Sequence, residues 1–364
     1  MKVAIGSEIF NGPWGGGNLF VINLKKYLTK KNIKVINNLV DPDIDIILLT
    51  EPRVESETST ISISEARLYK TFINKNVKIV HRINECDERK NTSYVNKKMK
   101  KVSKYADFTV FVSSWLSDLY KREGIKTKNS KVIMSGSDIE IFNNKNKKTW
   151  DQKSKLKIVT HHWGANWNKG FDTYIYLDKL LENKEFKNKF EFNYIGNLPK
   201  NFSFLNANYF KPLNGINLAN KLKENNLYIT GSINEPSGNH QIEASLCGLP
   251  VLYLDSGGIP EYQKSFGIEF QLQNLENTLE KIYNNFTFYF ERNKNFNFTS
   301  NSMCEEYLKT FRFLYQQKSN KKTNFYFYFY KILFKLNVIK YLRIFISKII
   351  FKLRKIRLSK EKSK

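Results

Sequence analysis

The chain has 364 residues, of which 41% are hydrophobic and 15% aromatic, enough to build the cores of two domains of ordinary size. Its three cysteines, Cys86, Cys247 and Cys304, are scattered and odd in number, so they predict neither a disulfide framework nor a zinc site and favour a reducing cytosol. The net charge is +26, which would suit a nucleic-acid partner, but residues 318–364 alone contain 15 Lys+Arg and one Asp+Glu, a net of +14. About half of the positive excess thus lies in the last part of the chain, and this distribution argues against nucleic acid as the partner.

The first part of the chain alternates short apolar strands with helices. Residues 1–5 lack the features of a signal peptide and predict a first strand over Lys2–Ile5, followed by a glycine-rich loop and a helix over residues 18–31. Further strands are expected over residues 45–50, 78–82, 106–112 and 131–134, with a helix beginning near Ser113. Such alternation predicts a parallel sheet.

The pattern then repeats. Residues 143–155 are polar and indicate a linker, after which strands are expected over 157–160, 190–195, 227–230 and 251–254, with another at Tyr209 and a helix over 171–181. We therefore divide the chain into a first domain (1–142), the linker (143–155), a second domain (156–300), a closing helix (301–317) and a basic tail (318–364). The predicted class is α/β, with two Rossmann-like domains.

Two carboxylates flank the expected start of a helix in the second domain. Glu235 follows the strand 227–230, and Glu243 stands eight positions later, just inside the helix. Ligands of open α/β sheets bind at the carboxyl ends of the strands, and the free amides of Ser237, Gly238 and Asn239 at a helix start suit a phosphate. Carboxylates accept hydrogen bonds from sugar hydroxyls. The segment predicts a nucleotide-sugar pocket; two solvated acids are the plainer interpretation.

This segment resembles the E-x7-E motif of the GT-B retaining glycosyltransferases of family 4. The resemblance extends through Cys247-Gly-Leu-Pro-Val251 and Gly257-Gly-Ile-Pro-Glu261, and covers residues 1–317. It implies a GT-B fold with two domains facing each other across a cleft, and a final helix that crosses back to the first domain. It also implies transfer of a sugar, with retention, from a nucleotide-sugar donor to a glycan or lipid-linked acceptor. Cell-surface polysaccharide synthesis fits such an enzyme by analogy.

The resemblance assigns roles to several residues. Glu243 is expected to hold ribose hydroxyls, Glu235 the sugar, and the amides of Ser237, Gly238 and Asn239 the phosphate. Gly16 and Gly17, in the loop before the first helix, let the backbone approach donor phosphate or acceptor; a tight turn is the alternative.

Two further side chains are candidates for catalysis. Lys169 follows the strand 157–160 and is expected to offset the charge of the departing diphosphate, although it could be one surface lysine among many. The family usually carries an arginine about six residues earlier, where this chain has Trp163. His81, in the strand 78–82, is expected to hydrogen-bond the sugar from the first domain, with a structural histidine as the alternative. The nearby Arg82, Glu85, Asp87, Glu88 and Arg89 form either an acceptor site or a surface charge cluster.

The basic tail combines aromatic and aliphatic residues with regularly recurring cations. In residues 325–358, Lys or Arg recurs at 331, 335, 340, 343, 348, 352 and 355, and no uncharged run is long enough to span a bilayer. We expect a helical segment that lies on an anionic membrane surface, at the inner face of the cell membrane. A solvated or packed extension is the alternative.

The sequence thus predicts a cytoplasmic, peripheral glycosyltransferase that requires neither metal nor other cofactor, because cationic side chains and a helix terminus take that role. Two alternatives remain open. A nucleotide-sugar epimerase of the same fold would need no acceptor, and a non-catalytic nucleotide-sugar-binding protein would explain the missing arginine. Nucleic acid is not expected as a partner, since no recognition module is present.

Overall fold

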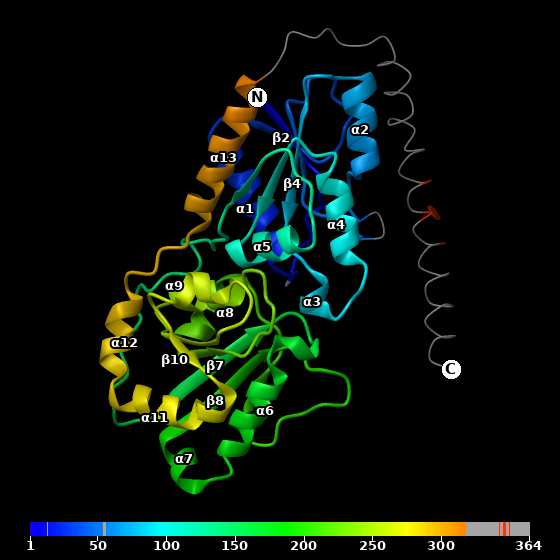
Figure 1. The fold of residues 1–364 in the computed structure, drawn as a ribbon. Coiled ribbons are helices and arrows are strands. Elements are labelled where there is room, and N and C mark those ends of the chain that lie inside the picture. Colours follow the sequence, from blue (N-terminus) through cyan, green and yellow to red (C-terminus); the bar gives the residue numbers. More distant parts are fainter. Residues whose placement is uncertain (13, 54–55, 318–341, 343–344, 347–348, 350–364) are drawn as a thin grey trace, which may run out of the picture.

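The computed structural model describes residues 1–12, 14–53, 56–317 and four tail residues, 342, 345, 346 and 349. The chain forms two α/β halves, one above the other in Figure 1, each built on a sheet of six parallel strands. The order is β2-β1-β3-β4-β5-β6 in the first sheet and β12-β11-β10-β7-β8-β9 in the second. The first sheet comprises β1 (Lys2–Ile5), β2 (Lys34–Ile36), β3 (Ile46–Leu49), β4 (Lys78–Ile83), β5 (Phe108–Phe111) and β6 (Ser130–Val132). The second comprises β7 (Leu156–His162), β8 (Phe190–Gly196), β9 (Asn208–Phe210), β10 (Leu227–Thr230), β11 (Val251–Leu254) and β12 (Ile268–Phe270).

Helices cover both faces of each sheet. The first half contains α1 (Gly16–Lys30), α2 (Ile63–Phe72), α3 (Asp87–Lys90), α4 (Val95–Ser103) and α5 (Ser114–Arg122). The second half contains η1 (Trp167–Lys169), α6 (Phe171–Leu180), α7 (Lys184–Lys189), α8 (Gly215–Lys223), α9 (Asn239–Leu246), α10 (Ile259–Gln263), η2 (Leu272–Asn274), α11 (Leu275–Asn284) and α12 (Phe286–Asn293). The central strands are buried on both faces and read as unbroken apolar runs, for example Ile46–Leu49, as parallel strands covered by helices do.

The last helix of the described core, α13 (Ser300–Gln316), returns to the first half and lies along it in Figure 1. Its apolar face, which includes Tyr307 and Phe311, packs into the same core cluster as Phe20 and Leu24 of α1. The crossing segment is fixed by backbone hydrogen bonds, because the amide of Ser300 donates to the carbonyl of Ser137 at 2.8 Å. The first core is therefore completed by the end of the chain.

Gly136 permits this crossing, and its substitution by alanine is expected to destabilise the protein. A Cβ at position 136 would lie 2.1 Å from the carbonyl oxygen of Thr299, so the crossing segment would have to shift. We expect the free energy of unfolding to fall by about 1–3 kcal/mol, as for overpacked sites. Chemical denaturation measures it. Gly17→Ala is the control, since a Cβ in this helical position meets nothing within 4 Å and alanine favours helix. Equal stability of the two variants would contradict the prediction.

Several observed helices and strands begin or end at other residues than the sequence predicted. Strand β4 runs to Ile83, past the expected end at Arg82, while β5 is shorter than the expected 106–112. Helix α1 begins at Gly16, inside the loop that the glycines indicated. The short strands β2 and β12 lie at sheet edges and have partly exposed residues, so their sequences lack an apolar run.

The basic segment 325–358 falls outside the described residues except for Leu342, Phe345, Ile346 and Ile349. In the part of the chain that the structure describes, no helix has the length and apolarity needed to cross a membrane.

Candidate functional site

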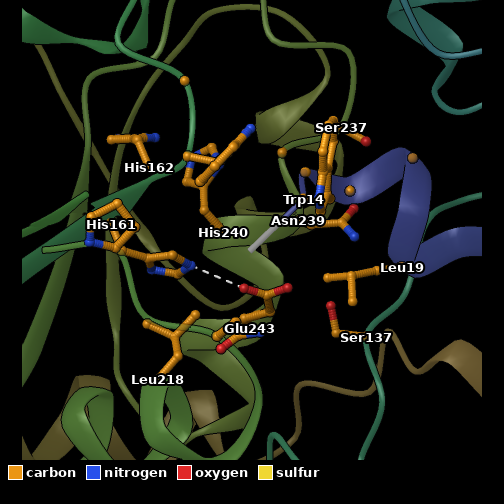
Figure 2. Close-up of a pocket in the computed structure, with 18 of the residues that line it drawn as sticks. Trp14, Leu19, Ser137, His161, His162, Leu218, Ser237, Asn239, His240 and Glu243 are labelled. Carbon is orange, nitrogen blue, oxygen red and sulfur yellow. Dashed lines mark hydrogen bonds and ion pairs between the residues drawn. The ribbon is translucent and has the colours of Figure 1, made fainter. Parts of the chain in front are cut away.

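A cavity of about 700 Å³ lies between the two halves and collects most of the predicted site residues. Figure 2 shows its wall, with Glu243 and His161 of the second half facing Ser137 and Leu19 of the first half. The lining from the first half includes Trp14, Gly15, Gly16, Gly17, Arg82, Asn84, Arg89, Ser137 and Asp138, and that from the second half includes His161, His162, Trp163, Lys169, Glu235, Ser237, Gly238, Asn239, His240 and Glu243. The cavity therefore has the predicted position, at the strand ends that face each other across the interface.

A buried ion-pair cluster joins the two halves at this cavity. Lys169, at the end of η1, is only 7% exposed, and its Nζ lies 2.5 Å from Oε2 of Glu235 on the loop after β10. Arg89 of α3 reaches the same carboxylate from the first half, with Nε at 3.1 Å. The Arg89 guanidinium also donates to Glu85, which Lys90 pairs as well. Three cations thus surround two carboxylates, and the excess positive charge is placed for an anionic ligand.

The cluster sets the ionisation of Glu235. Burial alone would raise the pKa of this carboxyl, but the adjacent Arg89 and Lys169 outweigh it and hold the pKa well below its usual range. Glu235 is therefore a carboxylate at neutral pH, bonded to both cations. The same electrostatic cluster keeps Arg89 of the first half against the second half, so the charge state of the site and the contact between the halves are coupled.

Glu243 occupies the second turn of α9 and points into the cavity from the second half (Figure 2). Its Oε2 lies 2.9 Å from Nε2 of His161, which ends β7 together with His162. His240 is the third histidine here, with its ring 4.7 Å from that of His162. Burial, with repulsion from nearby cationic and histidine groups, lowers the pKa of both His162 and His240 well below the usual value, so both rings are neutral at pH 7.

The N-terminus of α9 meets the N-terminus of α1 across the cavity. Gly238 takes a left-handed conformation (φ 68°) that turns the chain into α9. A Cβ on Gly16 would lie 3.1 Å from Cγ of Asn239, so the two helix starts are in close contact. The hydroxyl of Ser237 lies 3.2 Å from that of Ser135, which adds a second contact between the halves. Two positive helix ends therefore converge where the sequence predicted a phosphate.

His81 is the predicted site residue that the structure does not bring to the cavity. Its imidazole is 0% exposed, and Nδ1 lies 2.8 Å from the hydroxyl of Ser103 in α4. Burial lowers its pKa to about 3. Side chains alternate along β4, so His81 lies on the face covered by α4, whereas Arg82 lies on the opposite face, toward α1, and lines the cavity. His81 is a core histidine in this arrangement.

The charged residues at the end of β4 and after it do not form a single surface cluster, since Arg82 and Glu85 are buried. Asp87 accepts hydrogen bonds from the backbone amides of Val95 and Asn96 and so fixes the start of α4. Arg82 lines the cavity, and Glu85 is buried beneath Arg89. The contact of Arg89 with Glu235 spans 146 positions and left no signal in the local sequence.

The three cysteines are buried and unpaired. No group of His, Cys, Asp or Glu among the described residues is arranged to hold a metal ion.

No family model and no curated protein sequence matches the chain. Solved structures do. The HepE protein of Anabaena, in complex with UDP-glucose, is 12% identical with a TM-score of 0.64, covering 86% of this chain and 99% of that one. Sucrose-phosphate synthase of Thermosynechococcus elongatus is 14% identical with a TM-score of 0.61, again covering 86% and 99%. The lipopolysaccharide outer core galactosyltransferase WaaB is 13% identical with a TM-score of 0.61 over the same shares. These likenesses and the two parallel sheets confirm the predicted fold: the chain has the GT-B fold of glycosyltransferases.

Proposed function

We propose that the chain is a glycosyltransferase that moves a sugar, with retention, from a nucleotide-sugar donor to a glycan or lipid-linked acceptor. The observation that carries the proposal is the buried cluster of Lys169, Arg89 and Glu235 at the cavity between the halves. Cations fixed in a water-poor site stabilise charge that develops on a departing diphosphate. Complexes of HepE with UDP-glucose, and with UDP and glucose, support a nucleotide-sugar donor for a chain of this fold.

In the proposed complex the donor lies mainly on the second half. The amides of Ser237, Gly238 and Asn239 hold phosphate at the start of α9, and Glu243 accepts hydrogen bonds from ribose hydroxyls after exchanging its bond to His161. Gly16 and Gly17 bring the start of α1 to the donor phosphate or the acceptor. Arg89 supplies a guanidinium that the loop around Trp163 lacks, and it does so from the opposite half. His81 has no substrate contact in this arrangement.

The donor site predicts stabilisation by one family of nucleotide sugars. Purified protein is heated with UDP-, GDP-, ADP- or dTDP-sugars, and a ligand present at 100 times its dissociation constant adds about 2.7 kcal/mol. We expect a shift with one base that is lost in Glu243→Ala and retained in the exposed control Glu182→Ala. The absence of any shift, or an equal shift in Glu243→Ala, would contradict the assigned donor site. Product analysis with the stabilising sugar then separates transfer to an acceptor from isomerisation of the donor.

We further propose a role in cell-surface polysaccharide synthesis at the inner face of the membrane, to which the basic segment 325–358 attaches the enzyme. Its cations and aromatic residues support this. Deletion of residues 320–364 is expected to move the protein from anionic vesicles to the soluble fraction in a sedimentation assay. The truncated chain should keep its thermal response to the nucleotide sugar. Continued sedimentation of the truncated chain with vesicles would exclude this role for the segment.

A further inference from the structure

Arg82 lies buried at the cavity wall and has no counter-ion in the part of the chain that the structure describes. The residue is 4% exposed, and its guanidinium carbon lies 4.0 Å from the centre of the Phe20 ring. Its Nε and Nη1 are buried and have no hydrogen-bond partner, and no carboxylate among the described residues forms an ion pair with it. An unpaired buried charge is costly, and native proteins retain one where a function requires it.

Tyr307 and Tyr262 lie beside the Arg82 guanidinium, and further polar side chains of the first half line the same cavity. The hydroxyl of Ser137 lines the cavity, is buried and also lacks a partner. Lys26 of α1 lines the cavity too and is held by Glu140 at 2.5 Å and by Asp138 at 3.5 Å. Asp138 is the carboxylate of this wall, and Lys26 balances it. Among the described residues no ion pair compensates Arg82, and an unbonded hydroxyl lines the same cavity.

We propose that Arg82, with the hydroxyl of Ser137, binds an oxyanion carried by a substrate, a phosphate or carboxylate group. This site is distinct from the Lys169–Arg89 cluster, whose cations already pair with Glu235 and Glu85. An oxyanion accepts from Nε and Nη of one guanidinium in a planar, two-point arrangement and neutralises the buried charge. Assignment of the anion to a substrate rests on the proposed transferase function; the oxyanion site itself does not.

The test uses Arg82→Met in the full chain, with inorganic phosphate as the probe and chloride at equal ionic strength as reference. Methionine fills the apolar space over Phe20 without a charge, so the variant is expected to unfold about 2–4 °C higher than the wild type in the absence of phosphate. Its affinity for phosphate is expected to fall at least tenfold. Arg122→Met is the control, because Arg122 is exposed at the end of α5 and does not line the cavity. That variant should bind phosphate as the wild type does.

The titration is repeated with UDP to identify the source of the anion. A tenfold loss of UDP affinity in Arg82→Met assigns the oxyanion to the donor diphosphate, and unchanged UDP affinity with lost phosphate binding assigns it to the acceptor. Should the wild type bind phosphate through Arg82 but respond to no nucleotide sugar, the oxyanion site stands and the transferase proposal fails. Phosphate affinity that is unchanged in Arg82→Met, or no phosphate binding by the wild type, overturns the inference and leaves Arg82 a structural residue.

Discussion

Replacing Lys169 by methionine is expected to lower kcat for sugar transfer about 10²- to 10³-fold, with a much smaller change in donor affinity. The charge on the departing diphosphate grows in the transition state, and one fixed donor of this kind contributes a factor of that size. The Lys169 ammonium is shielded from water and is already positioned by Glu235 in the ligand-free protein, so it can pass to the diphosphate with little movement. Steady-state kinetics with the identified nucleotide sugar and acceptor, together with direct donor binding, measure both quantities.

The control for Lys169→Met is Lys187→Met. Lys187 is exposed on α7, which lies at the end of the second half away from the first half in Figure 1, and it does not line the cavity. Its loss should leave kcat unchanged. Thermal unfolding of Lys169→Met distinguishes lost catalysis from lost structure, since Arg89 still neutralises Glu235 in that variant. Full activity in a folded Lys169→Met protein would remove this lysine from the mechanism, and an equal fall in donor affinity and kcat would assign it to ground-state binding instead.

The predicted site residues that line the cavity lie mostly on single strand–loop–helix units. Glu235, Ser237 and Glu243 all belong to the unit formed by β10 and α9, so a local pattern was enough to place them at the strand ends. Lys169 likewise lies on the loop and short helix that follow β7, at the carboxyl end of that strand. His81 shows the limit of this reasoning. Neighbouring side chains of a strand point to opposite faces of the sheet, and both His81 and Arg82 lie within β4, which continues to Ile83. Arg82 therefore lines the cavity, whereas His81 points to the other face.

Contacts between the halves were not predictable in the same way. The Arg89–Glu235 pair joins positions 146 residues apart and depends on how the two halves meet, which no local pattern encodes. The bond between His161 and Glu243 spans 82 positions within the second half. In both cases the carboxylate expected to bind substrate is already bonded to a protein cation or imidazole. In the proposed complex the donor would exchange these bonds, and the exchange at Glu235 would alter a contact between the halves.

Glu235→Gln is expected to destabilise the ligand-free protein by about 3–5 kcal/mol, because Lys169 would lose its partner and Arg89 one of two partners in a buried site. The folded-state pKa of Glu235 is depressed, so its contribution to stability is present above the unfolded value of about 4.5 and is lost as the pH falls below it. The difference in unfolding free energy between wild type and variant should therefore shrink in acid. Glu182→Gln, at an exposed position, should show no such difference.

The same substitution has an opposite expected effect on ligand binding. A nucleoside diphosphate brings negative charge to Lys169 and Arg89, which the glutamine leaves unbalanced, so UDP should stabilise the variant more than it stabilises the wild type. Thermal unfolding at pH 7 with and without UDP measures both effects in one experiment. A variant that is less stable at every UDP concentration by the same amount would show that the two cations serve the structure alone. A larger response in the variant would show that Glu235 occupies the place of the diphosphate charge until the donor arrives.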